Sequence, residues 1–435
     1  MIFALILVLL GGGSNYAQTN NTWDLQSCID TALANHPSIK LQELSQELSA
    51  VDYREAQYNF TPNLNGNISQ SAAFGRNLDP ISNEFTQTSR QNTGLNASSS
   101  LVLFNGLRRI YSLKLSQLEM ANASLNKEIA QRNLKSEVLT YFLEAVLKNE
   151  LVKLNEWHLA YSTLMEENMR KKIQQETKTT YDLTEILVQK ENDKLAIANA
   201  RFQFQQACMQ LRQIIGIDQS RPFLPDTSQS LILKDTAAFK GIDQLPEYRQ
   251  TALNEKKNEL RLKSAQSNYF PQLMFNAGLG TGYSDRYFVT DPVTGEVFVP
   301  GVSDQFNQNL YQNISFSLSI PIYNRNQNRS NVSRTQVEVA QQQIKQEQLL
   351  DQLRMKINLL KKDIENSVES MNAAAIILDL ANEDFEISKV KYEQGLINFT
   401  QLAQKKDILY QAQNQFVQSK YNYYFKQKLL AIYYE

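Results

Sequence analysis

The sequence has very little of the side-chain chemistry from which catalytic and metal sites are built. Its 435 residues include two cysteines, Cys28 and Cys208, and two histidines, His36 and His158. These four residues form no motif, and they are too few for a zinc cluster or a histidine-based catalytic triad. Paired carboxylates, a nucleophile elbow and a phosphate-binding loop are missing as well. We therefore expect no enzyme activity, no metal and no cofactor.

The sequence also lacks an excess of charge of either sign. Basic and acidic residues nearly balance, so the formal net charge is -1, and no basic block occurs anywhere along the chain. Because a nucleic acid surface needs a basic patch, we expect no nucleic acid partner.

Long apolar runs are missing beyond the first residues. Residues 1–17, MIFALILVLLGGGSNYA, place small residues after an apolar core, which predicts a signal peptide cut after Ala17. No later stretch reaches the roughly 18 apolar residues of a transmembrane helix. An exported chain of this kind can span a membrane only as a β-barrel.

Glycine and proline are absent from two very long stretches, which predicts unusually long helices. Neither residue occurs from Leu107 to Ile215. We expect one helix over about residues 107–174 and a second over about 180–215, roughly 100 Å and 54 Å long at 1.5 Å per residue. An earlier helix near residues 39–60 would add length to the shorter leg. Apolar residues three and four positions apart in the long stretch are typical of a coiled-coil seam.

The points where the long helices reverse differ in sequence. From Ile322 to the C-terminus Gly395 is the single glycine, and glycine supplies the left-handed backbone that a helix stop requires. We expect the chain to turn back there. The matching turn in the first stretch falls at Glu176, which is followed by several threonines.

The sequence carries one pattern twice. Pro37 and Pro62 recur 209 positions later as Pro246 and Pro271, and further along the chain the offset becomes 219. The ten extra residues fall between residues 283 and 310, a Gly/Pro/Asp-rich run that predicts a longer hairpin loop. An internal duplication explains one frame shift placed in one loop. It predicts a signal peptide (1–17), a first repeat (18–216), an equatorial linker (217–241) and a second repeat (242–435).

We expect four β-strands, two in each repeat, and the two in the second repeat alternate most clearly. Residues 271–283 and 312–323 alternate apolar with small or polar residues, over the length of a tilted membrane strand. Residues 94–104 repeat the alternation more weakly, and residues 63–74 are nearly all polar. A soluble β-sandwich would alternate in the same way, so the strands alone leave both folds open. The residues expected to face lipid are Leu273, Phe275, Leu279, Ile314, Phe316, Leu318 and Ile320.

Four strands are too few to close a membrane barrel, because the smallest such barrels have eight. Open strand edges in lipid would leave backbone groups without hydrogen bonds. Several copies must therefore pool their strands, and three copies would supply twelve. The predicted fold is mostly α-helical, with long helices that continue from a short shared barrel.

Three segments resemble the TolC-like outer membrane efflux proteins. WDLQSCIDTALANHPSI (23–39) is similar to the opening helix of that family, and LVLFNGLRR (101–109) to its second strand and first long helix. KVKYEQGLINFTQLAQKKDILYQAQNQFVQSKYNYYFKQKLLA (389–431) resembles its final helical hairpin. The resemblance implies a homotrimer with a twelve-stranded outer membrane barrel and a periplasmic tube of twelve helices.

The resemblance also implies a place and a role. Such trimers lie in the outer membrane lipid of Gram-negative bacteria, with a large periplasmic portion, and act as exit ducts of efflux or type I secretion systems. A periplasmic adaptor (membrane fusion) protein and an inner-membrane RND or ABC transporter deliver drugs, small molecules or polypeptides to them. The family is not catalytic.

The family's tube narrows at its periplasmic tip, and the resemblance implies gate residues there. By position, the lock tyrosine is Tyr392, but the lock arginine is replaced by Ile397. Two family aspartates are replaced by Gln401 and Gln404, and one is retained as Asp182. Three copies of Asp182 would form a ring of like charges that binds cations or takes up protons more readily. The same residue would also serve as an N-cap of the returning helix.

Two other kinds of protein share part of the pattern. A periplasmic adaptor also has a helical hairpin, but β-rich halves flank it and the hairpin is not duplicated. A structural coiled-coil protein of the cell envelope also has long helices, but it does not need amphipathic strands. Both remain alternatives to the exit duct.

Overall fold

The computed structural model describes residues 22–78, 84–175, 180–218, 223–226 and 241–434. The predicted signal peptide, Glu176 and most of the predicted linker lie outside these residues. The chain divides into two compact units, and both halves of the sequence contribute to each. We call residues 1–42, 127–245 and 352–435 the helical unit, and residues 43–126 and 246–351 the sheet unit.

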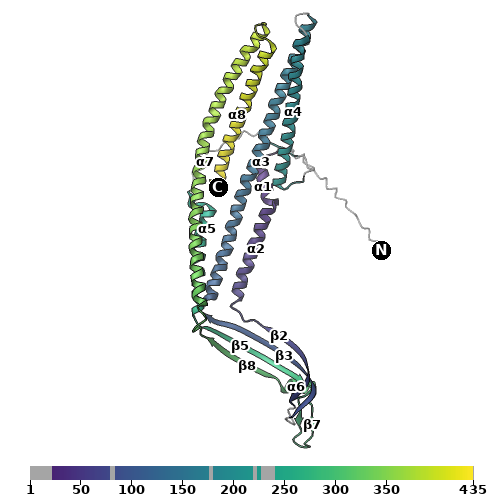
Figure 1. Ribbon diagram of the computed structural model, residues 1–435, viewed down its shortest axis with the longest axis vertical. Coiled ribbons are helices and arrows are strands. Elements are labelled where there is room, and N and C mark those ends of the chain that lie inside the picture. Colours follow the sequence, from purple (N-terminus) through teal and green to yellow (C-terminus); the bar gives the residue numbers. More distant parts are fainter. Residues whose placement is uncertain (1–21, 79–83, 176–179, 219–222, 227–240, 435) are drawn as a thin grey trace, which may run out of the picture. The chain divides into compact units, whose positions relative to one another are not determined.

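The order of the main elements in the second half of the chain repeats that in the first (Figure 1). The first half contains α1 (Leu25–Asn35), α2 (Pro37–Tyr58), β2 (Asn65–Leu78), β3 (Phe85–Asn105), α3 (Arg108–Gln174) and α4 (Thr180–Ile215). The second half contains α5 (Pro246–Gln266), β5 (Gln272–Ser284), β8 (Tyr311–Ser319), α7 (Gln327–Glu393) and α8 (Phe399–Tyr434). Short strands β1 (Thr22–Trp23) and β4 (Leu224–Pro225) pair with each other.

The long helices agree closely with the prediction. Both α3 and α7 have 67 residues, and both α4 and α8 have 36. Helix α7 starts 219 positions after α3 (327 minus 108), as α8 does after α4 (399 minus 180). The repeat boundaries at residues 216 and 242 stay a prediction.

The predicted helix near residues 39–60 begins earlier and is broken in two. Helix α1 ends at Asn35, and α2 begins at Pro37. Proline suits the first position of a helix, where its missing N–H would have no partner anyway. The residue before proline avoids helical backbone, and His36 is extended, with φ −66° and ψ 130°.

In the sheet unit, four antiparallel strands form one sheet in the order β2-β3-β5-β8 (Figure 1). The register aligns Leu101 of β3, Phe275 of β5 and Phe316 of β8 across three strands. The rings of Phe275 and Phe316 lie 5.2 Å apart. Among the described residues, β2 and β8 each pair on one side only, so this sheet has two open edges.

The two faces of this sheet have opposite chemistry. One face carries the predicted lipid-facing residues that lie in β5 and β8, of which Leu273 and Phe275 are half-buried and Leu279, Ile314, Phe316 and Leu318 are exposed. The opposite face carries mainly serine, asparagine and glycine. On that face Tyr311 donates a hydrogen bond across to Asn96, with a distance of 3.0 Å between Oη and Oδ1. Gly280 lies between them, and a Cβ there would come within 2.5 Å of both side chains.

The structure shortens one predicted strand and lengthens another. Strand β8 ends at Ser319, so Ile320, which was expected to face lipid from this strand, lies beyond its end. Pro321 follows and has no N–H for strand pairing. Strand β3 begins at Phe85, about nine residues before the predicted start, because its first part pairs with β2 despite its polar sequence.

The long loop predicted between residues 283 and 310 contains regular structure. It holds a small hairpin, β6 (Val289–Thr290) with β7 (Val297–Phe298), and a short helix, α6 (Val302–Gln308). Gln305 of α6 is fully buried. Its amide accepts a hydrogen bond from Ser284 N at 2.9 Å and donates to the carbonyls of Ser284 and Pro300 at 3.0 and 2.9 Å. These bonds fasten the loop to the end of β5.

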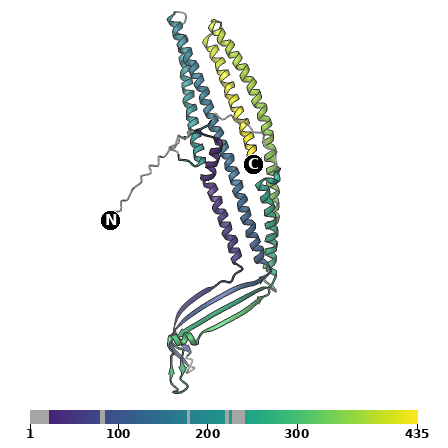
Figure 2. The same cartoon turned by 180° about the vertical axis from the view of Figure 1, so that it is seen from behind.

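In the helical unit, α4 lies beside α3 and α8 beside α7 (Figures 1 and 2). The unit has three apolar clusters: one where α1 packs on α3 and α4, one near the ends of the two hairpins, and a smaller one formed by α7 and α8 with Leu245. Cys28 and Cys208 are free thiols in the first cluster, where burial raises their pKa values to about 12 and about 11. No described helix combines the length and apolar character needed to span a membrane.

Candidate functional site

The turn between α7 and α8 is a glycine-dependent helix stop. Gly395 has φ +76°, and its N–H donates to Tyr392 O at 3.0 Å. The N–H of Leu396 donates to Lys391 O at 2.9 Å, which completes a Schellman motif. A Cβ on Gly395 would meet no atom within 4 Å. The backbone conformation, and not a lack of space, therefore explains the glycine.

Helix α8 begins with a reciprocal capping box. The N–H of Gln401 donates to Asn398 Oδ1 at 2.9 Å, and the N–H of Asn398 donates to Gln401 Oε1 at 3.1 Å. This arrangement satisfies two N–H groups that a helix start leaves without partners. Gln401 thus has a structural task in the turn, whereas Gln404 is exposed.

Tyr392 belongs to the apolar cluster below this turn. It is buried, and its ring contacts that of Phe399 edge-on, with 6.3 Å between centroids. The ammonium of Lys172, near the end of α3, lies 5.6 Å from the centre of the Tyr392 ring. Ile397 packs against the same cluster. Tyr392 therefore joins the ends of both hairpins through packing and a cation–π contact.

The first hairpin end is only partly described. Asp182 lies in the first turn of α4, but its side chain is outside the described part of the structure. Glu176 lies outside it altogether. The described residues contain no group of three or more histidine, cysteine, aspartate or glutamate residues that would hold a metal ion.

A buried polar cluster, which was not among the predicted site residues, joins three helices of the helical unit. Lys406 of α8 is 3 % exposed, and its Nζ lies 2.6 Å from Asp193 Oδ2 of α4 and 2.7 Å from Ser162 Oγ of α3. Ser162 also donates to the Asp193 carboxylate, and Gln189 donates to its other oxygen at 3.1 Å. We call Lys406, Asp193 and Ser162 the Lys406 cluster.

Two titratable side chains of α3 line this cluster. Burial lowers the pKa of His158 to about 4, although the hydrogen bond to Gln413, at 2.9 Å, opposes that shift. Burial raises the pKa of Tyr161 to about 12, and the Lys406 ammonium lies 5.8 Å from its ring. Both groups are therefore neutral near pH 7, and Lys406 and Asp193 are the charged pair inside the packing.

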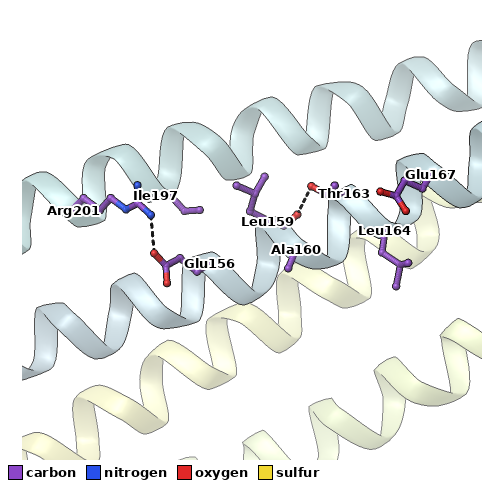
Figure 3. Close-up of a pocket in the computed structure, with 8 residues that line it drawn as sticks. All are labelled: Glu156, Leu159, Ala160, Thr163, Leu164, Glu167, Ile197 and Arg201. Carbon is purple, nitrogen blue, oxygen red and sulfur yellow. Dashed lines mark hydrogen bonds and ion pairs between the residues drawn. The ribbon is translucent and has the colours of Figure 1, made fainter.

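The first hairpin carries a shallow groove between α3 and α4 (Figure 3). Arg201 reaches across it to Glu156, with 2.7 Å between Nη2 and Oε1. The groove is lined by Glu156, Leu159, Ala160, Thr163, Leu164, Glu167, Ile197 and Arg201. Its mixed apolar and charged lining suits a protein surface better than a small-molecule pocket.

Several helix faces carry exposed apolar side chains in coiled-coil spacing. On α4 five of them recur every seven residues and are 53–71 % exposed: Tyr181, Val188, Leu195, Phe202 and Met209. On the sheet-unit part of α2 four are 48–69 % exposed: Leu44, Leu48, Val51 and Tyr58. Helix α7 also carries exposed apolar side chains. In its sheet-unit part they are Val337 and Ile344, and in its helical-unit part they are Ile376, Leu380, Ile387 and Val390. Such seams normally pack against another helix, and we call them the α4, α2 and α7 seams.

Comparison with known protein families finds one match, over the second half of the chain. The sequence model described as "Outer membrane efflux protein" matches residues 242–432, which is 191 positions and less than half of the chain. No curated protein sequence matches the chain.

The fold is that of solved outer membrane proteins. CusC, described in terms of transmembrane channel formation, superposes with a TM-score of 0.80 at 16 % identity, covering 94 % of this chain and 91 % of CusC. The outer membrane protein VceC from Vibrio cholerae superposes with a TM-score of 0.74 at 13 % identity, covering 94 % of this chain and 95 % of VceC. The open state of the outer membrane channel MtrE from Neisseria gonorrhoeae superposes with a TM-score of 0.74 at 18 % identity, covering 94 % of this chain and 88 % of MtrE.

At these low identities the solved structures show that the fold is shared and nothing more. The family model, in contrast, matches the sequence itself in the second half of the chain. The chain is thus similar to the TolC-like outer membrane efflux proteins, in sequence pattern over residues 242–432 and in fold over 94 % of its length.

Proposed function

We propose that three copies of this chain form the outer membrane exit duct of a tripartite efflux or type I secretion system. The observation that carries this proposal is the four-stranded sheet. Its apolar face is exposed, its other face is polar, and among the described residues its outer strands β2 and β8 each leave one edge open. Twelve strands from three copies would pair every edge and turn the apolar face to lipid.

The exposed seams support the same assembly. In the sheet unit, the α2 seam of one copy would pack on the first part of the α7 seam of the next copy. In the helical unit, the α4 seam would pack on the second part of the α7 seam. Different surfaces then meet at each contact, and such a head-to-tail interface closes into a ring when the rotation fits. The seams thus support a tube of twelve helices, four from each copy.

The partners follow from the role of a duct. We propose a periplasmic adaptor as the direct partner and an inner-membrane RND or ABC transporter behind it. The groove of Figure 3, with its apolar residues and the Arg201–Glu156 pair, is a surface on which an adaptor hairpin would pack. Co-purification of an adaptor from cells that express the chain, and its loss on Leu164→Glu, would support this arrangement. A periplasmic adaptor or an envelope coiled coil, the two alternatives, would not need a sheet with an exposed apolar face.

The turn residues lead to a proposal for the gate. We propose that the turn at Gly395 lies at the periplasmic tip, with Tyr392, Gln401, Gln404 and Asp182 near the narrow end of the duct. Since both glutamines are uncharged, Asp182 would supply the main acidic ring. Multivalent cations should then block the channel less than they block relatives with additional acidic rings.

Planar-bilayer conductance of the purified assembly measures this block. Asp182→Asn should remove most of the cation block seen in the wild-type channel. The double variant Gln401→Asp, Gln404→Asp should be blocked more strongly than the wild type. Strong block that survives Asp182→Asn would contradict the gate proposal. An absence of any conductance step would contradict the duct itself.

A further inference from the structure

The Lys406 cluster occupies a seam that is otherwise apolar. The residues of α8 that face the core recur at three and four positions: Phe399, Leu402, Lys406 and Leu409. The three apolar members are at most 8 % exposed, and Lys406 is as deeply buried as they are. A lysine at such a position is rare, because burying a charge takes it out of water.

Each of the three members of the cluster has hydrogen-bond partners, whereas the buried hydroxyl of the neighbouring Tyr161 has none. The three protons of Lys406 Nζ point to Asp193 Oδ2, Ser162 Oγ and the carbonyl of His158, the last at 3.4 Å. Both oxygens of the Asp193 carboxylate accept hydrogen bonds, one of them from Gln189. A complete network of this kind holds only in one alignment of the three helices.

The corresponding positions of the duplicated pattern carry no polar side chains. With the offset of 219 positions, Lys406 corresponds to Leu187, Asp193 to Ala412 and Ser162 to Ala381. Ala381 and Ala412 are buried members of one apolar cluster, and Leu187 is half-buried. The corresponding positions are therefore all apolar, and replacing a buried ion pair by apolar residues of similar volume is often neutral or stabilising.

We propose that the Lys406 cluster fixes the register of the second hairpin, α7 and α8, against the first, α3 and α4. Coiled-coil seams repeat every seven residues, so an apolar seam can shift by one heptad and bury nearly the same surface. A shift of α8 would move Lys406 away and leave the Asp193 carboxylate buried without its cation. A single lysine or asparagine at a core position of a coiled coil sets register in this way, with some loss of stability. The proposal concerns packing within one chain and does not depend on the duct.

Two readouts on the full-length chain in detergent test the proposal. The first is the thermal midpoint of Lys406→Leu and of the triple variant Lys406→Leu, Asp193→Ala, Ser162→Ala. Lys406→Leu should lower the midpoint, because it leaves a buried carboxylate without its cation. The triple variant should reach or exceed the wild-type midpoint. Lys405→Leu is the matched control, since its bridge to Asp384 is exposed and its loss should change little.

The second readout is the register itself. A photo-crosslinking phenylalanine in place of Tyr410, whose hydroxyl donates to Asn155 Oδ1 at 2.9 Å, should attach to α3 close to Asn155. Mass spectrometry locates the attachment. In the wild type we expect one site, and in the triple variant we expect additional sites one heptad away, near residues 148 and 162.

Two outcomes would overturn the proposal. A triple variant with a clearly lower thermal midpoint than the wild type would make the cluster a source of stability. A triple variant with the single wild-type attachment site would show that register is set elsewhere. The triple variant decides the matter even if Lys406→Leu alone does not fold.

Discussion

Replacing Phe316 by arginine should abolish assembly of the barrel. Phe316 lies near the middle of β8, on the apolar face of the sheet, and is 67 % exposed. If that face contacts lipid, an arginine near the bilayer midplane costs about 2–4 kcal/mol. Three copies carry three substitutions, so the trimer loses about 6–12 kcal/mol, comparable with the whole stability of an ordinary domain. Loss of the contact with Phe275 adds about 1 kcal/mol for each copy.

The neighbouring Ser315 provides the control. It pairs with Asn276 on the polar face, so an arginine there would lie in the water-filled interior and cost little. Size-exclusion chromatography with light scattering on the extracted outer membrane fraction measures the yield of assembled protein. Phe316→Arg should leave almost none, and Ser315→Arg should give nearly the wild-type yield. Equal yields from the two variants would refute the assignment of the faces.

Two further predictions concern stability. Gly395→Ala should destabilise the hairpin end by about 1–2 kcal/mol, because left-handed backbone costs a residue with a Cβ about that much. The expected result is faster amide hydrogen exchange in residues 390–400. Gly66→Ala, where φ is not left-handed and no atom is within 4 Å of the added Cβ, should leave exchange unchanged. His158 has a folded pKa of about 4, below the value of about 6.5 expected when unfolded. The folded state therefore binds fewer protons, and lowering the pH from 6.5 towards 4 should remove up to about 3 kcal/mol. The thermal midpoint should fall across this pH range in the wild type and much less in His158→Gln. An equal fall in both proteins would show that His158 is not the group responsible.

The sequence predicted the helices well because their boundaries are local. Gly216 and Gly395 stop their helices with φ of +74° and +76°, and Pro37 starts one. Between such points nothing interrupts the heptad spacing. The length of each leg could therefore be read from the positions of a few residues.

The sequence predicted strands less well where pairing, and not composition, decides their extent. The polar start of β3 is a strand because β2 pairs along it. Helix α6 was not predicted because its sequence has no apolar periodicity, and hydrogen bonds of Gln305 hold it in place. The Lys406 cluster was missed for a similar reason. Its members come from three helices, and only the lysine at a core position of an apolar heptad marked it in the sequence.

The mass of the complex extracted from the outer membrane decides whether three copies of the chain assemble there. Three copies of the 49.9 kDa chain give a protein mass of about 150 kDa, somewhat less once the signal peptide is removed. We expect this mass in the outer membrane fraction, together with channel conductance after reconstitution. A monomer of about 50 kDa in the soluble fraction would contradict it.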